Sequence, residues 1–298
     1  MIIENQADVT QAVEEAVSRV EDERLREILL ALVRHLHGFV REVRLTEREF
    51  GEAVRVIAAL GQKTTASHNE VMLMAGSLGV SPLVCLLNNG NHGESETQAN
   101  MLGPFWRDDQ PACKSGDSLV RSPTPGAELF VSVSLEDANG QPVAGAEVDV
   151  WHSSPVGMYE NQDPNQADMN LRGKFFTDAD GRFFYRSTKP GPYPVPVDGP
   201  VGDMLRAQLR HCYRPAHFHF LAFKEGFKTL VTQVFVADDQ YLHSDVVFGV
   251  TTALVGDYRR HPASEKPPAD DVTGDWYSFN YDLIMEPGDA KLPIPPIK

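Results

Sequence analysis

The sequence predicts a mainly β protein, with an antiparallel β-sandwich over residues 103–298 and an all-α domain before it over residues 1–102. Apolar residues recur at helical spacing in the first hundred residues, whereas they alternate with polar residues in most of the remainder. Turn signals separate the alternating segments, and we expect no helices between them. Short strands arranged in this way are typical of an antiparallel sandwich.

The all-α region begins with two apolar stripes. The first is formed by Val9, Val13, Val17 and Val20. The second and longer stripe comprises Leu25, Ile28, Leu29, Leu32, Val33, Leu36 and Val40. Thr46 and Glu49 then have the spacing of a capping box, which predicts the start of a further helix. The long stripe fits equally a helical core within one chain or a helix that also packs on a second subunit.

The β region shows three hairpin patterns. Alternating segments flank Asn139-Gly140, Asp180-Gly181 and Glu225-Gly226, and each pair predicts a tight turn. The tail, "PPADDVTGDWYSFNYDLIMEP", predicts one more strand. The sequence contains neither a fixed-period repeat nor a low-complexity tract.

The composition is that of an ordinary soluble globular chain, since 42% of the 298 residues are apolar and 23% are charged. The formal net charge of −15 repels phosphate groups, which argues against nucleic acids and anionic membranes as partners. No apolar run is long enough to span a bilayer, and the first residues lack the pattern of a signal peptide. Cys85, Cys113 and Cys212 are scattered and odd in number, which predicts reduced cysteines in a cytoplasmic protein.

The segment "RPAHFHF" at residues 214–220 carries the first chemical signal. A β-strand sends alternate side chains to opposite faces, so His217 and His219 point one way while Phe218 and Phe220 point the other. A general base needs one histidine, but two imidazoles on one face can converge on a metal ion. A structural pair of buried histidines is the alternative interpretation.

Two tyrosines extend this signal. Tyr159 follows "WHSSPVGM", and Tyr193 lies within "KPGPYPVPVDGP". A phenol ionises only near a pKa of about 10, but a trivalent ion beside it strongly favours the phenolate. Two phenolates and two neutral imidazoles would therefore suit Fe(III), although either tyrosine taken alone also fits ordinary packing in a loop.

These segments resemble the intradiol ring-cleaving dioxygenases, non-haem Fe(III) enzymes that split catechol-type diols between the two hydroxylated carbons. The resemblance lies in "DVWHSSPVGMYE", in "NLRGKFFTDADGRFFYRSTKPGPYPVPVDGP", and in "RPAHFHF" followed by "LVTQVF". It covers nearly the whole chain, and it makes the β-sandwich the catalytic domain. It implies one Fe(III) per subunit, held by Tyr159, Tyr193, His217 and His219. It also implies catalytic roles for Arg214 and Gln233.

The same resemblance implies how the site works. The diol binds Fe(III) through both oxygens, Tyr193 dissociates and takes one of the two protons, and Tyr159 stays bound. The substrate then reacts with O₂ and is opened to a dicarboxylate. Arg214 would stabilise negative charge that develops during the reaction. A surface ion pair is the alternative role for this arginine.

The neighbours of the second tyrosine bear on the substrate. Tyr193 lies between Pro192 and Pro194, whereas typical catechol enzymes of the family have glycines there. This context, "MNLRGKFFTD" and "LHSDVVFGV" resemble the branch that converts hydroxyquinol (benzene-1,2,4-triol) to 3-hydroxy-cis,cis-muconate, the enol form of maleylacetate. Catechol or chlorocatechol 1,2-dioxygenase activity, giving cis,cis-muconates, is the first alternative. A non-catalytic β-sandwich that binds a metal or a carbohydrate is the alternative from another class.

The resemblance also implies the walls of the substrate pocket. Besides Arg214, these are Leu73, Gly76, Met101, Leu102, Gly103, Pro104 and Phe105. Ordinary packing between the helices and the sandwich is the alternative for each. Some hydroxyquinol enzymes have an acidic residue near the position of Gly76. Its absence here weakens that substrate assignment or leaves space for another substituent.

Members of this family form homodimers through their N-terminal helices, around an apolar channel that can hold a phospholipid. The stripe from Leu25 to Leu36 suits such an interface, so the resemblance implies a homodimer. Cys212 lies beside His211 and close to the predicted site, and we interpret it as a packing residue.

Overall fold

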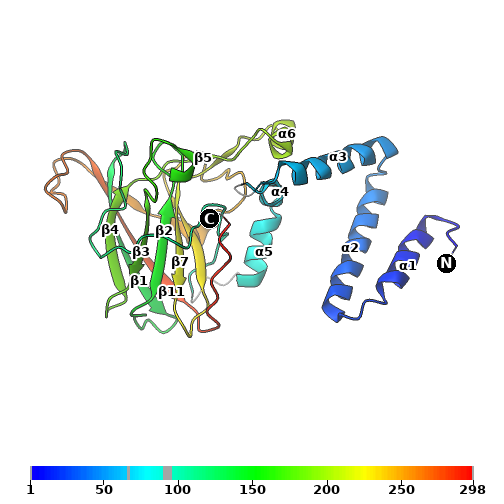
Figure 1. Ribbon diagram of the computed structural model, residues 1–298, viewed down its shortest axis with the longest axis horizontal. Coiled ribbons are helices and arrows are strands. Elements are labelled where there is room, and N and C mark those ends of the chain that lie inside the picture. The colour runs from blue at the N-terminus through cyan, green and yellow to red at the C-terminus, as the bar shows by residue number, and fades with distance from the viewer. Residues whose placement is uncertain (1, 66–67, 90–95, 297–298) are drawn as a thin grey trace. The chain divides into compact units, whose positions relative to one another are not determined.

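The computed structural model describes residues 2–65, 68–89 and 96–296, and Figure 1 shows the order of its helices and strands. The chain divides into two compact units, Met1–Ala59 and Leu60–Lys298. The first unit holds α1 (Gln6–Val17), α2 (Glu23–Glu42) and most of α3 (Glu47–Lys63). The second unit holds all strands of the described chain. A helical N-terminal region followed by a sheet-rich region is therefore confirmed.

The helices of the first unit begin at capping side chains and expose apolar faces. The predicted capping box is present, because the Glu49 carboxylate accepts from the Thr46 amide (2.9 Å) and the Thr46 hydroxyl accepts from the Glu49 amide (3.3 Å). Among the described residues, α1 and α2 contain no buried side chain. On the long stripe, four residues are 47–53% exposed: Leu25, Ile28, Leu32 and Leu36. Within the described first unit, the stripe is therefore left partly uncovered.

Besides the end of α3, the described part of the second unit contains the helices α4 (Glu70–Ser77), α5 (Val80–Asn89) and α6 (Pro200–Ala207) outside the sheets. We expected no helix between the strands, and α6 corrects that expectation. Pro200 stands at its start, where a missing amide hydrogen costs nothing, and Val201 and Leu205 are buried on one side.

The strands form three sheets. Their bounds are β1 (Glu128–Asp137), β2 (Glu147–His152), β3 (Arg172–Phe176), β4 (Arg182–Thr188), β5 (Tyr193–Pro194), β6 (Tyr213–Arg214), β7 (His217–Phe223), β8 (Leu230–Val236), β9 (Val255–Gly256), β10 (Tyr258–His261) and β11 (Trp276–Met285). Short 3₁₀ turns, η1 (Glu160–Gln162) and η2 (Thr252–Leu254), precede β3 and β9. Within the described residues the sheet orders are β10-β11-β1-β4, β3-β2-β7-β8-β9 and β5-β6.

The prediction of a strictly antiparallel arrangement is wrong for two strand pairs. β1 and β11 are parallel over their whole length, from Glu128 beside Trp276 to Asp137 beside Met285, and β8 and β9 are also parallel. Alternation of apolar and polar residues is the same in both kinds of pair. Strand direction between segments this far apart therefore leaves no local trace in the sequence.

Two of the three predicted hairpins are turns between sheets. All three turn glycines have positive φ values, as tight turns require: 74° at Gly140, 72° at Gly181 and 86° at Gly226. Gly226 joins the paired strands β7 and β8, so that hairpin is confirmed. Gly140 and Gly181 instead carry the chain from one sheet to the other, since β1 and β4 belong to the first sheet and β2 and β3 to the second.

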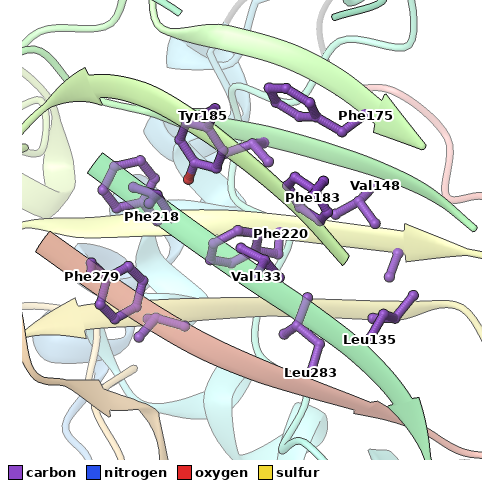
Figure 2. Packing of buried hydrophobic residues seen from close by; sticks show 14 of the residues in the cluster. Val133, Leu135, Val148, Phe175, Phe183, Tyr185, Phe218, Phe220, Phe279 and Leu283 are labelled. Atoms are coloured by element: carbon purple, nitrogen blue, oxygen red, sulfur yellow. The ribbon is translucent and has the colours of Figure 1, made fainter. Parts of the chain in front are cut away.

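The main hydrophobic core draws side chains from the four-stranded and the five-stranded sheet. Figure 2 shows Val133, Leu135, Val148, Phe175, Phe183, Tyr185, Phe218, Phe220, Phe279 and Leu283 packed together. Phe218 and Phe220 have no exposed surface, as the strand pattern predicted. The ring of Phe218 lies 6.4 Å from that of Phe279, which belongs to the other sheet. Residues of both sheets thus share one apolar interior, and the opposite face of the five-stranded sheet carries the buried polar residues His217 and His219 together with Trp151 and Leu221.

None of the described helices is long and apolar enough by itself to cross a bilayer. α4 and α5 together would have the length and composition for a span, but they are bent by 78° relative to each other.

Candidate metal centre

The two histidines of β7 lie side by side in the middle of the five-stranded sheet. β7 pairs with β2 on one side and β8 on the other. The Nε2 atoms of His217 and His219 are 3.1 Å apart, and each side chain is 1% exposed. The His217 Nδ1 lies 2.7 Å from the Pro215 carbonyl. A carbonyl only accepts, so Nδ1 carries the hydrogen and Nε2 presents a lone pair.

Both tyrosines reach the same place from loops. Tyr159 stands directly before η1, where the Gln162 side chain accepts from its amide at 3.1 Å. Tyr193 opens β5, which pairs with the strand that contains Arg214. Gly157 allows the two loops to meet, because a Cβ at this position would lie 2.4 Å from the Pro192 carbonyl oxygen.

The four side chains form one cluster. The rings of Tyr159 and Tyr193 lie 5.4 Å apart, Tyr193 lies 5.6 Å from His217, and Tyr159 lies 6.5 Å from His219. Both tyrosines are buried. The structure thus brings together all four residues that the sequence singled out as metal ligands.

Burial sets the protonation of this donor set. It lowers the pKa of His217 to about 3, with a further contribution from the Arg214 cation. It also lowers the pKa of His219 well below the ordinary value, so both imidazoles are neutral. Burial, followed by the neighbouring Tyr193, raises the pKa of the Tyr159 phenol well above its usual range.

The donor set fits a trivalent metal. The Tyr159 hydroxyl is buried and has no hydrogen-bond partner in the described chain, a costly state that a bound cation relieves. No group of three or more His, Cys, Asp and Glu side chains suited to a metal occurs among the described residues. A metal at the histidine pair would therefore need the phenols as ligands. Two phenolates supply hard, anionic oxygen donors, as Fe(III) requires.

Arg214 lies beside the cluster, fully buried. Its Nη1 donates to the Tyr193 hydroxyl and lies equally close to the His217 Nε2, at 3.3 Å in both cases. Its Nη2 donates to the Gln233 side-chain oxygen at 2.8 Å. This geometry excludes the surface ion pair that was the alternative role for Arg214.

The sequence did not point to Asp245, which is the counter-ion of Arg214. The carboxylate accepts from the arginine Nε (3.2 Å) and Nη2 (3.1 Å). Burial opposes ionisation, but the charge of Arg214 and hydrogen bonds from the Val247 and Gly249 amides lower the pKa of Asp245 below its ordinary value. The available signal was a single acidic residue directly before the apolar stretch "VVFGV".

Four residues of the segment 101–105 lie beside the cluster: Met101, Leu102, Gly103 and Phe105. A Cβ on Gly103 would lie 3.1 Å from the His219 ring. Phe105 stacks on Tyr159 at 4.3 Å, and Leu102 packs against the same aromatic group. The Met101 carbonyl accepts from the Gln233 amide at 2.6 Å. These four predicted pocket residues lie at or beside the candidate ligands.

The remaining predicted pocket residues are more distant or exposed. Leu73 packs in a cluster with Val247, two residues after Asp245. Gly76 faces the same valine, and a Cβ there would lie 3.2 Å from its Cγ1. Leu73 and Gly76 therefore lie near Val247 rather than beside the candidate ligands. Pro104 is exposed, and its place in the pocket stays a prediction.

Trp151 and Arg172, neither of which was predicted, pack against two of the candidate ligands. Trp151 of β2 stacks on His219 at 4.6 Å with an angle of 8° between the rings. Arg172 has no exposed side-chain surface, donates from Nε to Glu160 at 2.6 Å, and lies 5.9 Å from the Tyr159 ring centre. Partners of this kind fix the orientation of metal-ligating side chains.

Comparisons with known proteins identify the family of the chain. The family model described as "Dioxygenase" matches residues 102–287, and the model described as "Catechol dioxygenase N terminus" matches residues 22–96. The chain is 39% identical over 267 residues to a hydroxyquinol 1,2-dioxygenase of Rhizobium sp. strain MTP-10005, covering 89% of this chain and 90% of that protein.

Solved structures show the same relationship. A hydroxyquinol 1,2-dioxygenase from Pseudomonas putida DLL-E4 superposes with a TM-score of 0.87 at 38% identity, covering 95% of this chain and 99% of that one. A catechol 1,2-dioxygenase from Pseudomonas arvilla C-1 gives a TM-score of 0.81 at 28% identity, covering 97% and 94%. The resemblance noted in the sequence is confirmed, and the chain belongs to the intradiol ring-cleavage dioxygenase family.

Proposed function

We propose that this chain is a non-haem Fe(III) dioxygenase that uses O₂ to open hydroxyquinol to 3-hydroxy-cis,cis-muconate. The grouping of two buried phenols with two neutral imidazoles carries the ferric assignment. Fe(III) chemistry needs anionic donors to offset its charge, and the unpartnered Tyr159 hydroxyl is such a donor once ionised.

Each residue of the site has a role in this proposal. Tyr159, Tyr193, His217 and His219 hold one Fe(III) per subunit. A bound ferric ion would supply the redox chemistry that makes the ring of a bound diol reactive toward O₂. Tyr193 accepts a substrate proton, and the Arg214 Nη1 at 3.3 Å stabilises its phenolate until then.

Arg214 also provides a fixed positive charge where negative charge develops on the substrate. Gln233 holds both this arginine and the Met101 carbonyl, so it orients the charge relative to the pocket wall. Met101, Leu102, Gly103 and Phe105 would contact the ring of the diol, with Leu73, Gly76 and Pro104 completing the pocket.

Hydroxyquinol is proposed as the substrate because relatives named for it are 34–39% identical over most of the chain. Catechol is the competing substrate, since a catechol 1,2-dioxygenase shares the fold with a TM-score of 0.81. Oxygen uptake by iron-loaded protein with each diol distinguishes them. We expect a higher kcat/KM for hydroxyquinol, and a much higher value for catechol would overturn the substrate assignment.

Colour tests the ferric centre directly. Phenolate-to-Fe(III) charge transfer should make the iron-loaded protein wine-red. The variants Tyr159→Phe and Tyr193→Phe should each change the visible spectrum, because each removes one phenolate donor. A colourless protein with stoichiometric zinc would contradict the proposal and favour a non-catalytic metal-binding module.

We further propose a β-sandwich catalytic domain over residues 103–298 and a helical dimerisation domain over residues 1–102. The exposed stripe of α2 supports a homodimer, because a solvent-exposed apolar face of this length is costly. A bound phospholipid would cover further apolar surface. Light scattering should give twice the chain mass, and organic extraction should release the lipid. The half-buried, unpaired Cys113 and Cys212 fit a cytoplasmic location.

A further inference from the structure

A closed ring of hydrogen bonds lies behind the proposed catalytic arginine. Its members are Arg214, Gln233, Met101, Asn100, Gly249 and Asp245. From the arginine Nη2 the first link runs to the Gln233 Oε1 (2.8 Å), and the second runs from the Gln233 Nε2 to the Met101 carbonyl (2.6 Å).

Asn100 and Asp245 close the ring. The Met101 amide donates to the Asn100 Oδ1, and the Asn100 Nδ2 donates to the Gly249 carbonyl, both at 2.7 Å. The Gly249 amide then donates to the Asp245 Oδ2 (2.9 Å), which also accepts from the Arg214 Nη2 (3.1 Å). The ring therefore returns to the nitrogen at which it began.

The chemistry of the partners fixes the direction of every link. Arginine and backbone amides only donate, whereas backbone carbonyls only accept. The side-chain amides of Asn100 and Gln233 therefore each have one possible orientation. The four side chains that take part are buried, with exposed fractions of 8% for Asn100, 0% for Gln233, and 4% each for Arg214 and Asp245.

The ring leaves one end of the arginine for the site. Asp245 and Gln233 occupy Nε and Nη2, while Nη1 lies 3.3 Å from the Tyr193 hydroxyl and from the His217 Nε2. Gly249 makes room for this arrangement, since a Cβ there would lie 2.9 Å from the Arg214 Nη2.

The ring also ties this arginine to the pocket wall. Two of its links use the backbone of Met101, directly before Leu102 and Gly103. Gly103 approaches the His219 ring, and Phe105 stacks on Tyr159. The orientation of the Arg214 charge and the position of the wall are therefore set by the same hydrogen bonds.

We propose that Asn100 and Asp245 are positioning residues, which lock the Arg214 Nη1 and the wall at residues 101–105 into one rigid arrangement. This inference rests on the proposed dioxygenase function. Displacing a reacting group by about 1 Å costs on the order of 100-fold in rate, and loss of a supporting partner costs about 10- to 100-fold.

The test compares Asn100→Ala and Asp245→Asn with the matched control Thr232→Val. Thr232 adjoins Gln233 on β8, has no exposed surface, and donates to the Gln98 carbonyl (2.8 Å), two residues before Asn100. The Thr232→Val change thus removes one buried hydrogen bond between β8 and the segment that contains Asn100, and this bond does not belong to the ring. Visible spectra, kcat and KM with hydroxyquinol, and melting temperature are measured for iron-loaded proteins.

Asn100→Ala and Asp245→Asn should each shift the phenolate absorption, because Tyr193 accepts from Arg214, and both changes open the ring that fixes the position of this arginine. Each should lower kcat by about 10- to 100-fold with a smaller change in KM. The double variant should be no slower than the slower single variant, since one broken link already opens the ring. Thr232→Val should keep the wild-type spectrum and kcat.

Several results would overturn the positioning role. The first is an Asn100→Ala variant with the same spectrum and kcat as Thr232→Val. The second is a double variant whose loss in kcat equals the product of the losses in the two single variants. If Asp245→Asn does not fold, Asn100→Ala decides alone, because it leaves the Arg214–Asp245 pair intact. A colourless or inactive wild type would instead refute the proposed function, so the two failures are distinguishable.

Discussion

On strand β7, side chains that alternate between the two faces of the five-stranded sheet meet different surroundings. Phe218 and Phe220 lie in the apolar core that both large sheets share. His217 and His219 face buried polar groups, and burial shifts their pKa values far from the ordinary range. The core face stabilises the fold by removing carbon from water. The opposite face costs stability, because it holds polar groups away from water for the chemistry of the site.

The largest contrast should come from His219→Ala. On the polar face, this change removes a candidate ligand, so we expect loss of the red colour and a fall in activity of more than about 100-fold. Such a fall exceeds the effect of about 10- to 100-fold that follows from removing a residue that only supports a ligand. The fold should survive, because the lost imidazole has an unpartnered buried Nδ1. Iron content and circular dichroism check both statements. A red, active His219→Ala protein would show that the ligand set is different.

On the core face, Phe220→Ala should act in the opposite way. Loss of this fully buried ring should lower the free energy of unfolding by about 3–5 kcal/mol, through lost burial and a residual cavity. The protein that remains folded should keep its colour and its kcat. Denaturant unfolding measures the change, and Phe220→Leu is the milder control. A Phe220→Ala variant with wild-type stability but reduced iron binding would break the contrast between the faces.

Asp149 on the polar face of β2 gives a pH-dependent test. Burial raises its pKa to about 6, although Trp106 and Lys174 act in the other direction. The folded state therefore keeps this proton to higher pH than the unfolded state, and stability should fall as pH rises from about 4 to 6. The cost above pH 6 is about 2–3 kcal/mol.

Asp149→Asn should remove that cost. The difference in melting temperature between Asp149→Asn and wild type should grow in favour of the variant from pH 4.5 to pH 8. The reason is that the amide cannot ionise, while its oxygen still accepts from the Trp106 indole. Thermal unfolding at several pH values measures the difference. A gap between the two proteins that stays constant with pH would show that Asp149 does not titrate in this range.

Trp151→Phe should have the smallest effect. The phenyl ring keeps an aromatic face that can stack on His219. The substitution removes an indole nitrogen that has no hydrogen-bond partner in the described structure. Stacking of this kind contributes about 0.5–1.5 kcal/mol, so stability should change by about 1 kcal/mol or less. Iron affinity, measured by chelator competition, should fall by no more than about 10-fold. Trp151→Leu, which removes the aromatic face, should weaken iron binding further.

The grouping of the four candidate ligands could be predicted because its signals are local. The two-residue period of a strand placed His217 and His219 on one face, and the flanks of Tyr159 and Tyr193 carried the family resemblance. The same resemblance pointed to Met101, Leu102, Gly103 and Phe105, which lie beside the cluster, whereas the pocket wall itself stays a prediction. Helix positions in the first unit followed from apolar spacing and the Thr46–Glu49 cap.

The features that could not be predicted depend on contacts between distant segments. Asp245 lies 31 positions from Arg214, and Asn100 lies 149 positions from Gly249, so neither pairing leaves a pattern within a window of sequence. The same is true of the parallel pair β1 and β11. Turn signals at Gly140 and Gly181 gave the turns correctly but not the sheet that each following strand joins.

The pairing of β1 with β11 has a consequence for synthesis on the ribosome. β11 lies between β10 and β1 in the four-stranded sheet, yet it is the last strand of the described chain to emerge. Until it arrives, β1 presents an unpaired edge, and Phe279 and Leu283 are missing from the shared core. The four-stranded sheet therefore cannot be completed before β11 has been synthesised, and until then the open edge of β1 can pair with other chains.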